Sequence, residues 1–374
     1  MNTSKRWSRL AACGLVVVLT GLGVWSVSAA VVESNLEKSF RVGSRPRFSL
    51  DSDRGPVELR VGEAAEIQVK VQREVSNATA AQAREILAAH EVSFDQDASG
   101  ISVRARLNRE EKLGGRRQPQ LKVRFIVTVP PASDLDVKTA AGSIKGGNHA
   151  GEVRARTAGG DLEFGEIRGR FDAITAAGSI RCAGAGGAVT AKTSGGELRL
   201  GRLEADASLE TSAGSIHVKH VGGKLRARTA GGNIETGELL GPATLETSAG
   251  SITVGTAHAR LEARTSGGEL NLEDLRDAVV GSTSAGSIKA AFTAQPEGGS
   301  RLTTSGGNLE VRLDPELAFD LDASTRAGRV TTELPVVATV VGEHRTEALQ
   351  GKINGGGPAL VLKTSAGNIH LRKK

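Results

Sequence analysis

The side chains best suited to acid–base or metal chemistry are histidines, of which the chain has seven: His90, His149, His217, His220, His258, His344 and His370. His217 and His220 form the closest pair. They are not part of an HExxH motif, which zinc metalloproteases use, and no cluster of cysteine and histidine, as in structural zinc sites, surrounds them. We therefore predict no metal-binding residue and interpret the histidines as solvated surface residues.

Serine and threonine hydroxyls could act as nucleophiles, and they recur throughout the phrase T-[AS]-[AG]-G-x-[IL]. A catalytic residue is needed once, whereas this phrase returns about a dozen times. Neither a GxSxG elbow nor a phosphate-binding GxxxxGK[ST] loop is present. The repetition favours a structural ladder in which hydroxyl groups bond neighbouring units, and we predict no catalytic residue.

Acidic residues occupy one position of the phrase in some copies, namely Asp161, Glu197 and Glu269, and serines occupy it in the copies between them. Carboxylates stacked in this way could hold a cation weakly. The calcium-binding repeat GGxGxDxUx is missing, however. We interpret the alternation as a way of spacing like charges, and we expect no metal ion and no cofactor.

A polysaccharide-active β-helix enzyme is a minor alternative. Such an enzyme needs a non-repeating cluster of acidic or basic residues on one face, and the sequence offers none. Both tryptophans, Trp7 and Trp25, lie near the amino terminus, and the chain has no tyrosine to stack on sugars. Cys182 lies in an apolar column, where cysteine behaves as a small hydrophobic residue. We predict that the protein is not an enzyme.

The repeated phrase has a fixed period. Its threonines are 18 residues apart, at Thr139, Thr157, Thr175, Thr193, Thr211, Thr229, Thr247, Thr265 and Thr283. Looser copies begin at Thr304, Thr325 and Thr364. A fixed period of this length is typical of a solenoid, in which each repeat forms one layer stacked on its neighbours.

Each copy carries apolar residues two positions apart, which is the period of a strand with one buried face. In one copy, Ile252 and Val254 follow Thr247, and Leu245 precedes it. By this parity the threonine also points inward, and the glycine-rich phrase forms a corner between two short strands. We predict an all-β fold, an elongated parallel β-solenoid (β-helix) with 18-residue layers. An antiparallel meander with hairpin turns at each Gly-Gly is the alternative.

The residue before each threonine alternates in charge through five copies: Lys192, Glu210, Arg228, Glu246 and Arg264. Strands that pair in register lie about 4.8 Å apart. Opposite charges would then be direct neighbours and would stabilise the stack by about 0.2–1 kcal/mol for each pair. This column favours parallel layers over the meander.

The repeats are flanked by less regular segments. We predict that residues 31–134 form an amino-terminal cap and that residues 135–374 form the solenoid with a carboxy-terminal cap, because a solenoid must cover its end strands. The cap should contain a helix over Thr79–Glu91, with Asn77 as its N-cap and with Ile86 and Leu87 on its apolar side. The expected cap strands are Phe40–Val42, Val57–Val61, Ile67–Val71, Ile101–Arg106 and Leu121–Val129.

Two further segments have expected conformations. Asn108–Gln118 is rich in charge and glycine, and we predict a solvated loop there. Beyond Thr331, the expected strand is Val336–Val341, followed by a polar turn over Gly342–Arg345.

Residues 1–30 have the pattern of a signal peptide. Lys5, Arg6 and Arg9 form a basic head, Leu10–Val27 is apolar, and Ser28-Ala29-Ala30 is a small-residue cleavage site. An uncleaved membrane anchor over residues 10–32 is the alternative. LAAC at Leu10–Cys13 resembles a lipobox but precedes the apolar run, so we treat it as a chance match. The net charge is +6, half of it from the three basic residues of this segment, and no nucleic-acid partner is predicted.

The order of motifs resembles a known family. VPPASDLDVKTAAGSIKG (Val129–Gly146), the T-[AS]-[AG]-G-x-[IL] array and the closing GKINGGGPALVLKTSAGNIHLRK are similar to the bacterial family of exported β-strand-repeat proteins that are proposed adhesins. The family is defined by a domain of unknown function. The resemblance implies a β-solenoid on an exported protein, and it carries no catalytic residues.

Together these features predict an exported, non-catalytic, adhesin-like protein of the cell envelope that binds macromolecules, either polysaccharide or protein, through a repetitive surface. The alternative is a passive or regulatory envelope component without an external ligand. The expected location is the periplasm, the cell surface or the extracellular space, with contact to the membrane only through an uncleaved amino-terminal segment.

Overall fold

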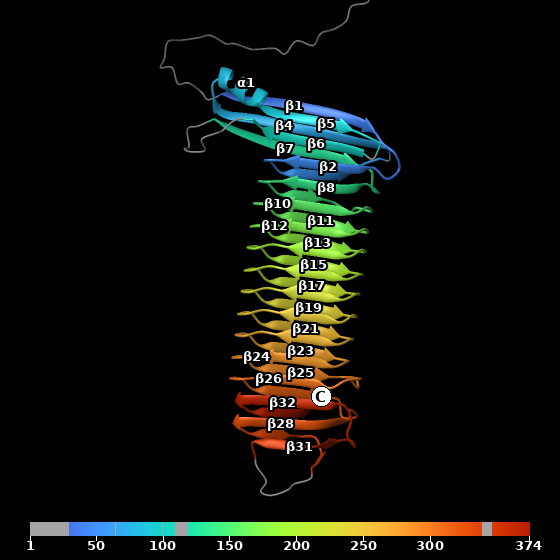
Figure 1. The fold of residues 1–374 in the computed structure, drawn as a ribbon, viewed down its shortest axis with the longest axis vertical. Coiled ribbons are helices and arrows are strands. Elements are labelled where there is room, and N and C mark those ends of the chain that lie inside the picture. The colour runs from blue at the N-terminus through green and yellow to red at the C-terminus, as the bar shows by residue number, and fades with distance from the viewer. Residues whose placement is uncertain (1–29, 64, 99, 109–118, 339–345) are drawn as a thin grey trace, which may run out of the picture.

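The computed structural model describes residues 30–63, 65–98, 100–108, 119–338 and 346–374. They form a long stack of strands with a wider amino-terminal end (Figure 1). Within the described residues there is one helix, α1 (Ala80–Ala89), and no helix is long and apolar enough to cross a bilayer. The prediction of an all-β chain with one short helix is confirmed.

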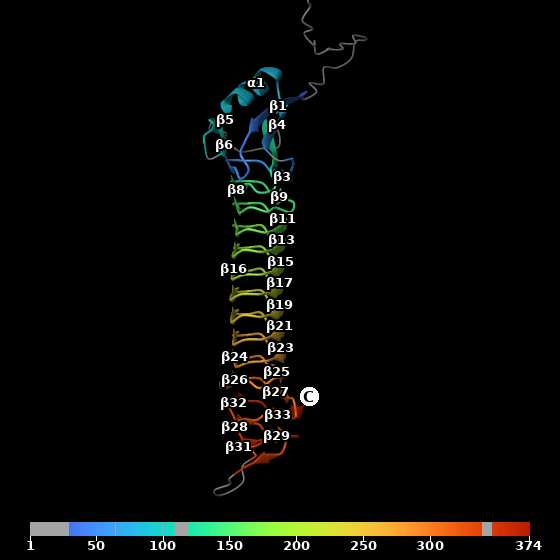
Figure 2. The same ribbon diagram turned by 90° about the vertical axis from the view of Figure 1, so that its right-hand side faces the viewer.

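Two sheets run the length of the stack, facing each other across the core (Figure 2). The first sheet contains the strands after each glycine corner: β9 (Ile144–Gly146), β11 (Leu162–Ile167), β13 (Ile180–Ala185), β15 (Leu198–Leu203), β17 (Ile216–Val221), β19 (Ile234–Leu239), β21 (Ile252–Ala257), β23 (Leu270–Leu275), β25 (Ile288–Phe292) and β27 (Leu309–Leu313). The second sheet contains those before each corner: β8 (Asp134–Thr139), β10 (Val153–Thr157), β12 (Phe171–Thr175), β14 (Val189–Lys192), β16 (Ala207–Glu210), β18 (Leu225–Arg228), β20 (Ala243–Glu246), β22 (Leu261–Arg264), β24 (Val279–Thr283) and β26 (Ser300–Thr304).

Strands of successive layers pair in parallel. In the first sheet, Ile180 lies between Leu162 and Leu198, and in the second, Phe171 lies between Val153 and Val189. The array is therefore a parallel stack, and the alternative of an antiparallel meander is wrong. A Gly-Gly pair reads as a hairpin signal in isolation, but here it turns the chain from one sheet to the other within a layer.

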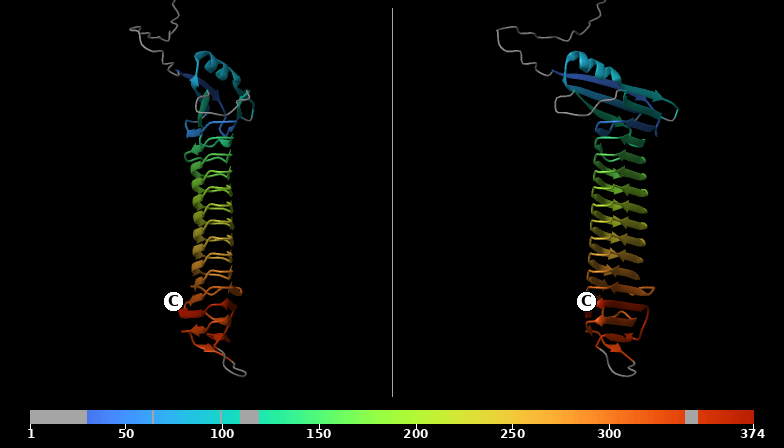
Figure 3. Two further views of the ribbon diagram at one scale, coloured as in Figure 1. Left: turned by 90° about the vertical axis from the view of Figure 1, so that its left-hand side faces the viewer. Right: turned by 60° about the vertical axis from the view of Figure 1, so that its left-hand side comes forward.

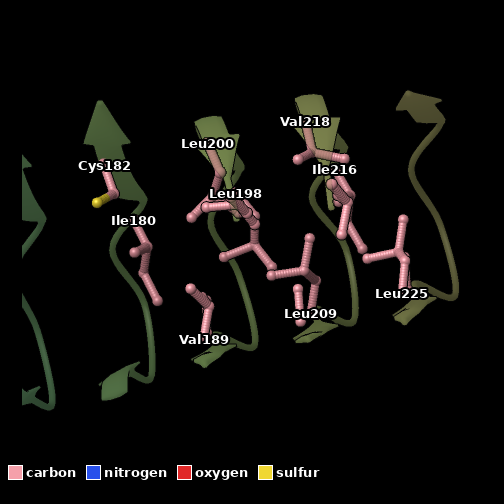
Figure 4. Packing of buried hydrophobic residues seen from close by; sticks show 14 of the residues in the cluster. Ile180, Cys182, Val189, Leu198, Leu200, Leu209, Ile216, Val218 and Leu225 are labelled. Carbon is pink, nitrogen blue, oxygen red and sulfur yellow. The ribbon is translucent and has the colours of Figure 1, made fainter. Parts of the chain in front are cut away.

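The core lies between the two sheets. Figure 4 shows Ile180, Leu198 and Ile216 of successive layers pointing into it, with Leu209 and Leu225 entering from the opposite side. Ile180, Leu198 and Ile216 are all completely buried. Because the same apolar columns recur in every layer, the core is continuous along the array.

The threonine of each corner points inward, as its parity predicts, and it ties adjacent layers together. Thr211 is 4% exposed, and its hydroxyl donates to the carbonyl oxygen of Gly196 in the preceding layer, 2.9 Å away. The Thr211 hydroxyl oxygen also accepts from the backbone N–H of Gly214 at 3.3 Å. The predicted ladder of hydroxyl groups between layers is thus present.

The last glycine of the corner is required by close approach of the next layer. A Cβ at Gly178 would lie 2.0 Å from the carbonyl oxygen of Gly160. The backbone of the preceding layer leaves no room for a side chain at this position. The column of glycines is therefore a direct consequence of the stacking of layers.

The amino-terminal end interleaves with the array. Its strands are β1 (Ala30–Arg41), β2 (Arg47–Ser52), β3 (Val57–Val61), β4 (Glu66–Ala78), β5 (His90–Gln96), β6 (Gly100–Leu107) and β7 (Gln120–Val129). Strands β2 and β3 pair in parallel with β8 and β9, so they form a layer of the same stack. Strands β6 and β7 form the next layer outward, and antiparallel β5, β4 and β1 follow.

Helix α1 differs from the prediction at its start. Its N-cap is Thr79 and not Asn77: the Thr79 hydroxyl accepts from the backbone N–H of Gln82, and the Gln82 side chain accepts from the N–H of Thr79. Such a reciprocal pair satisfies two donors of the first turn. Asn77 instead has a φ of 57° at the end of β4. Ile86 is buried as expected, and Leu87 packs against the core while partly exposed.

At the carboxy-terminal end, the order of layers departs from the order of the chain. The strands are β28 (Phe319–Ala327), β29 (Val330–Thr332), β30 (Val336–Val337), β31 (Ala348–Ile353), β32 (Ala359–Ala366) and β33 (Ile369–Lys373). The last two, β32 and β33, pair with β26 and β27 on one side and with β28 and β29 on the other. The chain terminus therefore lies within the stack (Figure 3).

Several predicted features fall wholly or partly outside the described residues. These are the signal peptide with its lipobox-like motif and both tryptophans, the loop over Asn108–Gln118, His344, the second half of the strand Val336–Val341, and the turn over Gly342–Arg345.

Candidate binding surface

The outer face of the second sheet carries the predicted charge column. Lys192 pairs with Glu210, Glu210 with Arg228, and so on in register through Arg264. The Nζ of Lys192 lies 3.0 Å from Glu210 Oε2, and the Nε of Arg228 lies 3.8 Å from Glu246 Oε2. Lys192 donates to Glu210 and holds the pKa of that carboxyl below its ordinary value. These half-exposed pairs make a charged stripe that runs along the stack.

The stripe is not uniform. Arg264 lies beside Glu246 in register, yet its guanidinium contacts Glu262 on its own strand. Most charged residues of this column therefore pair with a residue of the neighbouring layer, but at Arg264 the ion pair is made within one strand.

The outer face of the first sheet has its own column. Lys145 contacts Glu163 of the next layer at 2.9 Å, and farther along lie Arg199, His217 and Glu235 in consecutive layers. A shallow hollow in this face is lined by these three residues together with Lys219 and Thr236. The first sheet is thus the face on which histidines and carboxylates meet.

The interpretation of the histidines as solvated is wrong for three of them. His90, in the amino-terminal end, is 2% exposed, His149, in the turn between β9 and β10, is 6% exposed, and His220, on β17, is 6% exposed. Burial lowers the pKa of His90 to about 4, and it also lowers that of His149, whose Nε2 lies 2.6 Å from the carbonyl oxygen of Ser133.

The remaining described histidines lie on the surface. His217 and His258 contact carboxylates of neighbouring layers, and His370 contacts the hydroxyl of Thr331. His217 and His220, the closest pair in the sequence, bind different glutamates, Glu235 and Glu238. Among the residues the structure describes, no three metal-type side chains converge on one point.

The acidic corner residues take part in a second ladder between layers. The Oδ1 of Asp161 accepts from the backbone N–H of Ser179 at 2.8 Å, and the Ser179 hydroxyl accepts from the N–H of Glu197 at 3.2 Å. Glu269 likewise donates its N–H to the hydroxyl of Ser251. In this column Asp161 and the serines supply the acceptor that the next layer needs, whereas Glu197 and Glu269 take part through their backbone N–H.

Cys182 occupies the inward column beside Leu200 of the next layer (Figure 4), and its register partner in the preceding layer is Phe164. Its thiol is 3.2 Å from the carbonyl oxygen of Gly184, and burial raises its pKa to about 11. A thiol with that pKa is not a nucleophile at neutral pH. The predicted structural role of Cys182 agrees with this placement.

A further hollow lies where the amino-terminal strands meet the first corners, lined by Asn35, Pro56, Gln72, Lys122 and Arg124 among others. Two of its basic side chains form ion pairs: Lys122 with Glu74 at 3.3 Å and Arg124 with Glu58 at 2.8 Å. The pKa of Glu58 is lowered chiefly by its contact with Arg60 and to a smaller extent by its contact with Arg124. Sequence reasoning missed this hollow because its residues come from five separate segments.

Comparison with known proteins places the sequence in a family. The family model described as Toastrack DUF4097 matches residues 46–283, beginning just before β2. No curated protein matches. The match runs from β2 to β24 and so includes the regular copies of the corner phrase that begin at Thr139 through Thr265.

Solved structures with detectable likeness include the following three. A proposed cell adhesion protein from Clostridium sporogenes ATCC 15579 is 8% identical, with 92% of this chain and 100% of that one covered and a TM-score of 0.22. A proposed adhesin from Bacteroides fragilis NCTC 9343 is 11% identical (91% and 97% covered, TM-score 0.20). A proposed lipid-binding protein from Parabacteroides distasonis ATCC 8503 is 10% identical (90% and 96% covered, TM-score 0.26). Because the family model covers more than half of the 374 residues, the chain belongs to the Toastrack DUF4097 family.

Proposed function

We propose that this protein is an exported, non-catalytic component of the bacterial cell envelope that binds macromolecules, in the manner of an adhesin, through the repeated outer faces of its array. The observation that carries the proposal is that the two sides of each strand have different roles: inward residues hold the layers together, and outward residues form the surface. Inward threonines and the cysteine are engaged in bonds within and between layers, whereas outward positions carry charged columns such as Lys192 and Glu210.

The unit of this surface is a solenoid layer of 18 residues. Register partners such as Leu198 and Ile216, or Ala207 and Leu225, support that unit because each pair is 18 residues apart. Layers about 4.8 Å apart present the same polar positions again and again. Many weak contacts can then add up to useful avidity with a long polymer or a repetitive protein.

Export and location complete the proposal. Residues 1–30 carry a basic head, an apolar run and a small-residue site, the pattern of a signal peptide. We propose that the mature chain starts at Val31 and resides in the envelope, with polysaccharide or protein partners and without a cofactor.

The test is retention together with turnover. The chain from Val31 to Lys374 is incubated with bacterial cells and with purified envelope polysaccharides, and both the bound protein and any released sugar are measured. We expect retention that weakens with salt, since charged columns mediate it, and no released sugar. Turnover that a single point substitution abolishes would contradict the proposal. A complete lack of retention would favour a passive envelope component.

A further inference from the structure

The alternating charge column of the second sheet is complementary to itself. Its members in consecutive layers are Lys192, Glu210, Arg228, Glu246 and Arg264. Half a turn about an axis that runs parallel to the strands, between two layers, reverses the order of the layers. Within the column, each cation of one copy then faces an anion of the other. The column therefore fits a second copy of itself that runs antiparallel to the first.

The charges of this column remain accessible to a partner. Ion pairs join Lys192 to Glu210 and Arg228 to Glu246, yet the Lys192 and Arg228 side chains are still 47% and 63% exposed. Arg264, which contacts a glutamate on its own strand, is 53% exposed. An ionised carboxylate has about four lone-pair sites, so it can accept from a second cation without losing the first.

The residues beside the column keep this face low. Two positions earlier on the same strands, three of the five layers carry short, half-buried hydroxyl side chains: Thr190, Ser208 and Thr244. The array itself is straight (Figure 1). A second face of the same kind can therefore come close enough for the longer charged side chains to reach across.

The axis that matches the charges best is also the middle of the stack. The second sheet has six strands in the order β8, β10, β12, β14, β16 and β18. Six more follow in the order β20, β22, β24, β26, β32 and β28. An axis between β18 and β20 therefore brings all of these layers of one copy over those of the other. The wider amino-terminal end of each copy then lies beyond β28 of the other, so it does not come between the two faces.

Across this axis, opposite charges meet at three kinds of place. The facing pairs are Arg228 with Glu246, Glu210 with Arg264, and Asp172 with Arg301. Two-fold symmetry makes each pair occur twice. Next to the column, Arg226 faces Thr244 and Glu262 faces Ser208, and these hydroxyls can accept or donate. Nearer the ends Arg156 faces Lys363, but each already pairs with an aspartate of its own copy.

We propose that two copies of this chain associate as an antiparallel, two-fold symmetric dimer through the outer faces of their second sheets, with the charge column at the centre of the contact. A second copy is the partner because its charges have the spacing of the layers, about 4.8 Å, and the reversed order that this face requires. Complementary charges of this kind fix the register and suppress wrong partners. The proposal concerns self-association, so it goes beyond the proposed binding of envelope macromolecules and does not rest on it.

The experiment measures the mass of the chain from Val31 to Lys374 in solution by analytical ultracentrifugation, at about 50 mM and about 500 mM salt. Wild type is compared with two column variants, which circular dichroism first shows to be folded. Glu210→Lys with Glu246→Lys makes the column entirely basic. Lys192→Glu with Arg228→Glu and Arg264→Glu makes it entirely acidic. The control is Glu163→Lys with Glu273→Lys, which changes the net charge as much as the basic variant does but on the first sheet.

We expect wild type to dimerise at the lower salt and its apparent affinity to fall about tenfold at the higher salt, because the contact is charged and exposed. Each column variant alone should stay monomeric, since like charges then face each other, and an equimolar mixture of the two should associate. The control should dimerise as wild type does. Wild type that stays monomeric at the lower salt, or column variants that do not associate with each other, would overturn the proposal. Monomeric wild type together with column variants that lose retention on bacterial cells would assign the column to an external partner instead.

Discussion

The hydroxyl of Thr364 donates to the carbonyl oxygen of Gly307, 2.9 Å away, across 57 residues of sequence. Within the array, the same bond joins Thr211 to Gly196, only 15 residues earlier. The ladder then continues backward in the chain, because Thr325 donates to Gly367 at 2.9 Å. The last copy of the phrase is therefore inserted between two layers that precede it in the sequence.

This insertion predicts the effect of a carboxy-terminal truncation. Removing Ala359–Lys374 deletes β32 and β33, through which the layer of β28 and β29 is joined to the array. We expect β28 and β31 to become sensitive to protease while the layers before β26 stay resistant, because each layer depends on its nearest neighbours.

The measurement is limited proteolysis with identification of the first cleavage sites. Removal of Lys374 alone is the control, since it leaves both inserted strands in place. Cleavage spread evenly along the array, or no new cleavage beyond Thr304, would show that the end layers do not rely on the inserted strands.

The threonine ladder predicts a cost for losing one hydroxyl. Thr211→Val keeps the size of the side chain but leaves the carbonyl oxygen of Gly196 and the N–H of Gly214 without their partner. Each buried polar group left unsatisfied costs about 1–3 kcal/mol. Thr211→Ser retains the hydroxyl and should be milder. Urea unfolding followed by circular dichroism compares the two, and equal midpoints would mean that the hydroxyl does not stabilise the stack.

The facing of the strands predicts opposite outcomes for neighbouring substitutions. Ile252 is completely buried, whereas Thr253 lies on the outer face. Ile252→Asp would place an unpaired charge in the core and lose about 1.5–3 kcal/mol of apolar burial as well. Thr253→Asp should leave the thermal unfolding temperature nearly unchanged. Comparable unfolding temperatures for both variants would contradict the assignment.

The threonine ladder and the facing of the strands were predictable from sequence for a physical reason. A strand buried on one face imposes a period of two, and the fixed spacing repeats it, so the positions of Thr211 and Ile252 follow from parity alone. The capping pair of Thr79 and Gln82 matches the S/T-x-x-E/Q motif of a capping box, so the sequence also contains the signal for the correct N-cap, and the prediction of Asn77 as the N-cap overlooks it.

Other features could not be read in this way. The copies at Thr304, Thr325 and Thr364 have nearly the same corner phrase, so nothing local says which one stacks on which. Strand β2 was missed because its corner carries Ser52 in place of threonine, aligned with Thr139. The burial of His220, by contrast, follows the alternation of β17, in which Ile216 and Val218 are also buried; the alternation ends only at Val221, which is buried as well.

Burial of His90 predicts that acid destabilises the amino-terminal end. Its pKa falls from 6.5 to about 4, chiefly through burial and then through the charge of Arg73. Between these values the unfolded chain binds a proton that the folded chain does not. Stability is therefore complete above about pH 6.5 and declines as the pH falls toward 4, by about 3 kcal/mol at most for this one group.

His90→Leu removes this titration. Hydrogen exchange of α1, which ends beside His90, should then become less sensitive to acid than in wild type, and His258→Gln, on the surface, should leave the sensitivity unchanged. An undiminished acid response in His90→Leu would show that other groups cause it.

The central claim, that the repeated surface is the binding element, is tested most directly by the number of layers. Deleting residues 194–211 or 194–229 removes one or two repeats and rejoins equivalent positions of the corner phrase, so the stack should still close. Retention of the chain from Val31 on bacterial cells is measured for each length. The account predicts a graded fall in apparent affinity with each layer lost, as expected for many weak contacts. Affinity that is unchanged until a particular layer is removed and then disappears would place binding in one discrete site and contradict it.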